Sequence, residues 1–154
     1  MASLTSPDLL LSLRIPVGSD LDGDADMLRI ALPDGDGHRR PTFTVRSGVP
    51  SEPGEAFFTA FREKAVARMP DTVEGFELLD RQDFVLSSFV DVTAVFYRRT
   101  LPDGTAVSQL QAYLWASSYR MYVVDAATAR EQEARDLPLF ADILHSVRLL
   151  PPPD

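Results

Sequence analysis

Residues 76–126 contain four successive segments with the pattern of β-strands, and this run constrains the fold more than any other feature. The segments read FELLDRQDFVLSS, VTAVFYRRT, VSQLQAYLW and YRMYVVDA. They are rich in β-branched and aromatic residues, as is typical of strands. The turn LPDG at residues 101–104 has the Pro, Asp and Gly that hairpins favour. Because such short connections join antiparallel neighbours, the sequence predicts an antiparallel sheet.

Three further strands are predicted before this run, at residues 9–16, 27–33 and 42–48. Residues 51–70 predict a helix with Ser51 as its cap and Pro70 as its end, because apolar residues recur there at helical spacing. A second helix is predicted after the last strand, with Asp136 as its cap. The order β-β-β-α-β-β-β-β-α favours an α+β fold, in which two amphipathic helices pack on one face of a single antiparallel sheet.

The bulk composition bounds the class of protein. The chain has 154 residues without an internal repeat or a linker, so we expect one domain over residues 1–154. Its net charge of −8 argues against nucleic acid and an anionic membrane surface as partners. No apolar run approaches the roughly 18 residues of a membrane span. No basic residue precedes the N-terminal apolar patch, and there is no cysteine. We therefore expect a cytoplasmic protein that does not insert into membranes.

The acidic loop at Asp20–Asp26 is the strongest hint of a metal site. Its aspartates alternate as in an EF-hand, but that loop needs Gly at its sixth position and Glu at its twelfth. Those positions are Ala25 and Ala31. His38 and His145 show no spacing typical of metal ligands. We expect a solvated loop and no metal, while cation binding at Asp20–Asp26 stays open.

Motifs of catalysis are missing from the sequence. Ser87 and Ser88 lack the context of a nucleophile elbow, and PDGDGH lacks the Lys and the helix of a phosphate loop. Carboxylates are scattered, so no pair stands out as an acid/base dyad. We therefore expect a protein that is not an enzyme and needs no cofactor.

One face of the predicted sheet has an unusual composition. The helices are expected to cover the face that carries Leu28, Ile30, Leu32, Val92, Ala94, Phe96, Leu110, Ala112 and Leu114. The reverse face then carries Met27, Arg29, Val95, Tyr97, Gln109, Gln111, Tyr113 and Trp115. Tyr and Trp are typical of binding surfaces, and amides bond a partner without desolvating a charge. We interpret this face as a concave binding groove; the alternative is an ordinary solvent face.

The register of the strand after Trp115 has two solutions. A turn of two residues would place Arg120, Tyr122 and Val124 in the groove, and a turn of three would place Tyr119, Met121 and Val123 there. Met121 and Val123 suit a core, which favours the first solution and adds Tyr122 to the candidate groove.

The chain resembles the Eag (effector-associated) chaperones of type VI secretion, a family with a DcrB/PsbP-like fold. The resemblance rests on the order and spacing of segments across most of the chain. They are LRIP, MLRIALP, PTFTVRSG, PGEAFFTAFREKAVARMP, VEGFELLDRQDF, LQAYL and a last helix that ends in VRLL and prolines.

This resemblance implies a function in the bacterial cytoplasm. Eag chaperones are dimers that bind the hydrophobic N-terminal segment of a secreted effector and shield its transmembrane helices until the effector is loaded onto the spike. Gln111 falls on a groove glutamine of the family. Arg29 departs from its apolar groove residues, and Phe61 stands where a second amide is expected. The alternative is a non-enzymatic binding protein of the same fold with another partner, such as an immunity or accessory protein.

Overall fold

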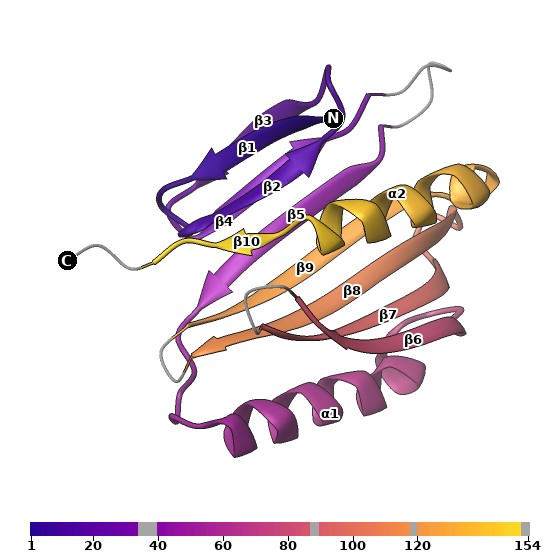
Figure 1. Cartoon of the computed structure of the whole chain (residues 1–154). Helices are drawn as coiled ribbons and strands as arrows, with labels where there is room; N and C mark the ends of the chain where they lie inside the picture. Colours follow the sequence, from indigo (N-terminus) through magenta and orange to yellow (C-terminus); the bar gives the residue numbers. More distant parts are fainter. Residues whose placement is uncertain (34–39, 87–89, 118–119, 152–154) are drawn as a thin grey trace.

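The computed structural model describes residues 1–33, 40–86, 90–117 and 120–151 (Figure 1). These ranges contain two α-helices and ten β-strands. The helices are α1 (Glu55–Thr72) and α2 (Glu133–His145). The strands are β1 (Ala2–Ser6), β2 (Leu11–Ile15), β3 (Asp20–Asp24), β4 (Met27–Ala31), β5 (Thr42–Gly48), β6 (Glu77–Val85), β7 (Asp91–Thr100), β8 (Ala106–Ser117), β9 (Arg120–Ala129) and β10 (Arg148–Leu149).

The strands form two antiparallel sheets. The larger has seven strands in the order β3-β4-β5-β9-β8-β7-β6, and the smaller has the order β1-β2-β10. The α+β class and the antiparallel pairing are therefore confirmed, whereas the prediction of a single sheet was wrong. The first predicted strand became β2, which pairs with β1 and β10 instead of joining the main sheet. The acidic segment predicted as a loop forms the edge strand β3, where its side chains stay exposed to solvent.

The main core lies between α2, the small sheet and one face of the large sheet. Phe140, Ile143 and Leu144 of α2 are buried there with Leu11 and Leu13 of β2. The large sheet contributes the residues predicted for the helix-packed face, among them Ile30, Ala94, Phe96, Leu110, Ala112 and Leu114. The prediction of this core is confirmed.

Helix α1 packs on the opposite face of the large sheet, so the prediction of both helices on one face was wrong. Its Phe58 ring stacks on Trp115 at 5.2 Å, and Met69 is buried with Val95 and Tyr97. Strands β6 to β8 lie between the two helices (Figure 1). The physical reason is competition for space, because the small sheet and α2 together cover the first face and leave α1 only the second.

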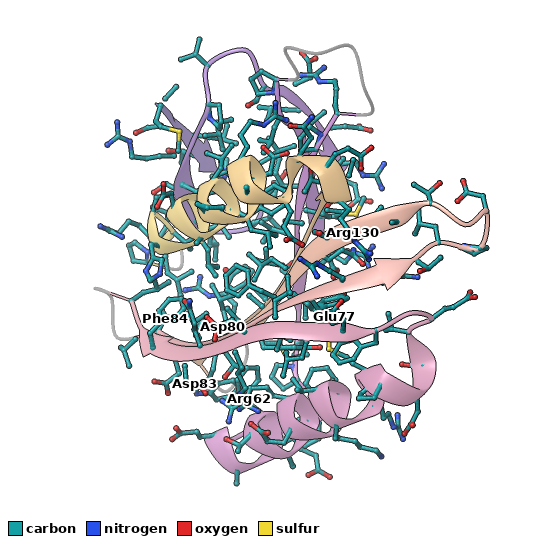
Figure 2. All side chains as sticks on the ribbon, turned by 90° about the vertical axis from the view of Figure 1, so that its right-hand side faces the viewer. Arg62, Glu77, Asp80, Asp83, Phe84 and Arg130 are labelled. Atoms are coloured by element: carbon teal, nitrogen blue, oxygen red, sulfur yellow. The ribbon has the colours of Figure 1, made fainter. Side chains whose placement is uncertain are left out.

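Polar contacts also hold α1 against the edge strand β6. The two terminal nitrogens of Arg81 donate to the Glu63 carboxylate at 2.6 and 3.0 Å. Figure 2 shows Arg62 of α1 near Asp83 of β6. The Arg81 hydrogen bonds and its positive charge lower the pKa of Glu63, with Arg62 contributing less.

The two predicted helix caps were wrong. Helix α1 begins at Glu55 after Gly54, whose φ of 110° is accessible to glycine, and it continues through Pro70 in its last turn. Asp136 lies inside α2, where it is 1% exposed and accepts hydrogen bonds from Thr128 and Arg135. A short 3-10 turn before α2 moved the helix start three residues upstream of Asp136.

Candidate functional site

Three rows of side chains cross the α1-bearing face of the large sheet, because the strand pairs are in register. The central row runs Arg29, Thr44, Asp125, Gln111 and Val95 on β4, β5, β9, β8 and β7. The neighbouring rows are Ala31, Thr42, Ala127, Gln109 and Tyr97, and Met27, Arg46, Val123, Tyr113 and Thr93. Directly paired residues of antiparallel strands lie on the same face, so each row is a line of neighbours.

Helix α1 covers only the β7 and β8 side of this face. The rest, which we call the open half, comprises Met27, Arg29, Thr42, Thr44, Arg46, Gln109, Gln111, Met121, Val123, Asp125 and Ala127. Arg29 and Arg46 are exposed, and Thr44 is buried among them, while the others are half-buried. Phe61 of α1 is 37% exposed and meets the Tyr113 ring edge-on at 6.2 Å. It therefore forms an apolar wall beside the open half.

A chain of hydrogen bonds occupies the centre of the open half. The Tyr113 hydroxyl donates to Gln111 Oε1 at 3.0 Å, and Gln111 Nε2 donates to Asp125 Oδ1 at 3.1 Å. Burial raises the pKa of Asp125, an effect that the charge of Arg46 and the Gln111 hydrogen bond partly offset. Burial, together with the nearby Asp125 charge, raises the pKa of Tyr113 to about 12, so its hydroxyl stays a donor at neutral pH.

A second polar contact lies one row along. Arg99 Nη1 of β7 donates to Gln109 Oε1 at 3.5 Å. The Arg99 Nε is buried and has no hydrogen-bond partner among the described residues. A buried donor without an acceptor costs free energy, so this end of the face is the less satisfied one.

A pocket of about 570 Å³ opens at the Gln109 end of the face. Its lining is mostly apolar and includes Leu101, Val107, Ala127 and Ala129, and its polar lining residues are Arg40, Thr42, Thr105, Gln109, Thr128 and Glu131. Among these, the Arg40 guanidinium donates to Asp20 and to main-chain carbonyls of Gly18, Ala31 and Leu32. The pocket volume is in the range of sites that bind organic ligands or peptide side chains.

The predicted groove residues separate into three groups. Met27, Arg29, Gln109 and Gln111 lie on the open half, on the sheet face to which the sequence pattern assigned them. Four others share that face on the side where α1 packs: Val95, Tyr97 and Tyr113 are buried and not free to line a groove, and Trp115 is half-buried under the Phe58 ring. The last one, Tyr122, lies on the opposite face.

The placement of Tyr122 corrects the favoured register. Trp115 pairs with Met121 and Tyr113 with Val123, so Met121 and Val123 face the open half. Tyr122 is fully buried in the main core, where its hydroxyl donates to the Leu9 carbonyl. Val124 is buried there as well, so the turn solution with Tyr119, Met121 and Val123 was the better one, although Tyr119 lies outside the described residues.

Sequence reasoning missed Asp125 and Arg46 on this face. It interpreted the groove as having few charges, yet these two groups and Arg29 lie in or beside the central row. The alternation in YVVDA could have indicated Asp125 once Val123 was assigned to the open half.

The acidic segment shows no arrangement that would hold a metal ion. Within the described ranges, no cluster of three or more His, Asp or Glu side chains has the geometry for one. Asp22 and Asp24 accept main-chain hydrogen bonds at 2.7 and 2.9 Å, and Asp20 pairs with Arg40. His145 stacks on Phe84 at 4.3 Å, while His38, Ser87 and Ser88 lie outside the described residues. None of the described helices is long and apolar enough to cross a membrane.

Comparison with known proteins identifies the fold. No protein-family model and no curated protein matches the chain. A Pseudomonas aeruginosa protein of unknown function, PA94, described as a putative regulator, is similar over 100% of this chain and 99% of its own, with 16% identity and a TM-score of 0.68. LpqN, involved in cell envelope biogenesis of Mycobacterium tuberculosis, matches 92% of this chain and 83% of its own, with 13% identity and a TM-score of 0.72.

Cyanobacterial PsbP (CyanoP) from Synechocystis sp. PCC 6803 is similar over 96% of this chain and 91% of its own, with 13% identity and a TM-score of 0.67. At such identities the similarity concerns the fold alone. The chain has a PsbP/DcrB-like fold.

Proposed function

We propose that this protein is a chaperone of the Eag type, which binds and shields an apolar N-terminal helix of a type VI secretion effector before that effector is loaded onto the spike. The observation that carries the proposal is the open half, a strip of sheet with apolar side chains and hydrogen-bonded amides beside the exposed ring of Phe61. A sheet face that was fully covered or uniformly charged could not bind an apolar helix.

The dimensions of the open half suit a single helix. From β4 to β8, the outermost strands that contribute to the open half, there are three interstrand spacings, which is about 14 Å. An α-helix with its side chains is about 10–12 Å wide. One helix can therefore lie on this floor, with α1 and Phe61 along one side and the acidic edge strand β3 along the other.

The chemistry of the open half suits an apolar helix that carries a narrow polar or small-residue stripe. Met27, Met121, Val123 and Ala127 offer apolar surface, and burial of such surface contributes about 25 cal/mol per Å². Methionine adapts to varied partners because its side chain is flexible. The Asp125 carboxylate accepts from Gln111 and lies near Arg46, so a bound helix would not leave it as an unpaired buried charge.

The remaining elements of the proposal follow from the same role. The protein would act in the cytoplasm of the secreting bacterium, as a homodimer, without cofactor or catalytic chemistry. Its net charge of −8 would keep a complex with an apolar segment in solution.

Co-expression with an N-terminal fragment of a spike-associated effector tests the proposal. We expect the fragment to be soluble and to co-elute with the protein, and to aggregate without it. Val123→Asp, on the open half, should abolish the rescue. Val17→Asp is the matched control, because Val17 is 77% exposed and lies between β2 and β3, outside the residues of the open half. A fragment that is equally soluble alone, or a protein that binds only effector segments without an apolar helix, would contradict the proposal.

A further inference from the structure

The two glutamines of the open half have fixed amide orientations. A carboxylate only accepts hydrogen bonds, so Gln111 must present its Nε2 to Asp125, at 3.1 Å. Its Oε1 then receives the Tyr113 hydroxyl. A guanidinium only donates, so Gln109 must present its Oε1 to Arg99. Charges of opposite sign thus orient the two amides.

These orientations leave mainly donors for a partner. One N–H of Gln111 and both N–H groups of Gln109 have no hydrogen-bond partner among the described residues. Asp125 already accepts from Gln111, and Glu131, which lines the pocket, is exposed to solvent. A partner bound at the Gln109 end of the open half would therefore need to supply hydrogen-bond acceptors.

The chemistry of the pocket beside Gln109 limits which kinds of acceptor group can bind there. Its walls are mostly apolar, with Leu101, Val107 and Ala129, and the Arg40 guanidinium has its own partners in the chain. A small hydrophilic anion would leave these walls uncovered. The matching group combines apolar side chains with unpaired carbonyl oxygens.

The last turn of an apolar α-helix has this combination. Four carbonyl oxygens at the carboxyl end of a helix have no intrahelical partner, and that end carries partial negative charge. The amino end would instead bring unpaired N–H groups and partial positive charge toward Arg99 and the Gln109 amide. We infer that the pocket binds the carboxyl-terminal turn of the client helix, so that clients lie across the open half in one direction. This inference rests on the proposed function.

Site-directed cross-linking measures the direction, since the chain has no cysteine of its own. Thr105→Cys places a thiol at the pocket, and Val49→Cys places one just beyond the opposite end of β5. The probe is a synthetic helix of about 20 Leu and Ala residues, with flanking lysines and one cysteine at either its amino or its carboxyl end. Fluorescence anisotropy of the full-length protein with each probe measures binding separately.

We expect the carboxyl-terminal cysteine to form a disulfide with Thr105→Cys, and the amino-terminal cysteine with Val49→Cys. The reverse pairing, or equal rates for both ends, would overturn the inference while leaving the proposed function intact. A probe that shows no binding by anisotropy would overturn both.

A second set of variants tests the donors themselves. Gln109→Glu replaces two donors by a carboxylate of the same shape, and we expect about tenfold weaker binding and loss of the end preference. Gln82→Glu makes the same change on the exposed strand β6 and should leave both unchanged. If the affinity for the probe helix and its binding direction are unchanged in Gln109→Glu, the pocket does not recognise carbonyl oxygens.

Discussion

Phe58→Ala should destabilise the protein strongly, because this ring anchors α1 to the sheet. Phe58 is 2% exposed, stacks on Trp115 at 5.2 Å with an interplanar angle of 30°, and lies 5.9 Å below the Arg62 guanidinium. Truncation of a buried Phe costs about 3–5 kcal/mol. The Phe58 ring lies between α1 and the sheet, and a movement of α1 toward the sheet can fill part of the cavity. This favours the lower end of that range, about 3 kcal/mol. For a chain of this size that corresponds to a fall in Tm of about 6–12 °C.

Urea unfolding followed by circular dichroism measures this loss, and the single tryptophan, Trp115, reports the same event by fluorescence. Phe61→Ala is the control on the same helix, and we expect a cost of about 1 kcal/mol, because Phe61 is already 37% exposed. A double-mutant cycle with Trp115→Ala should give a coupling energy of about 0.5–1.5 kcal/mol. Equal losses for the two phenylalanines, or no coupling to Trp115, would refute the placement of α1 on this face.

Three other changes have expected outcomes. Gln111→Ala should weaken client binding about fivefold with the fold intact, and Gln111→Glu more, since its carboxylate would face Asp125; anisotropy measures both. Burial raises the pKa of Asp125, so the native state loses stability as the pH rises from about 3.8 through that raised pKa. The free energy of unfolding of Asp125→Asn should therefore equal that of the wild type below about pH 3.8 and exceed it above the raised pKa. Urea titrations at a series of pH values measure this difference. Hydrogen bonds from Arg98 and Ser108 lower the pKa of Glu133 from 4.5 to about 2, so its stabilising contribution is fully present above 4.5 and is lost as the pH falls through about 2. Glu133→Gln should cost about 1 kcal/mol at pH 7, and this difference from the wild type should shrink as the pH falls through about 2; an acid series without that convergence would contradict the assignment.

Much of the large sheet could be predicted from local patterns. Leu28 and Ile30 of β4 and Leu32 just after it alternate because one side of this segment faces the main core, and the same holds for Leu110, Ala112 and Leu114 of β8. Such alternation involves only neighbours within one strand, so it can be recognised directly in the sequence. The face of the sheet on which α1 packs cannot be recognised in this way, because helical spacing shows that a helix has an apolar stripe but not where the stripe packs.

The remaining wrong predictions concern residues whose environment depends on contacts with residues far away in the sequence. Tyr122 looks like a groove residue until its hydroxyl meets the Leu9 carbonyl, which is 113 residues away in the chain. Asp20, Asp22 and Asp24 look like a loop, because aspartate is depleted in strands, yet an edge strand tolerates them. Within the candidate site, Gln109 and Gln111 could be placed on one face from their spacing, whereas Asp125 and Arg46 required the register of β9 against its neighbours.

The most direct test of client binding is an NMR titration of the isotope-labelled protein with the apolar probe helix. Binding across the open half predicts selective changes in the side-chain amide signals of Gln109 and Gln111 and in the methyl signals of Met121 and Val123, with little change around Tyr122. Unchanged spectra, or changes that gather around α2 and the small sheet, would contradict the proposal that this face receives a hydrophobic helix.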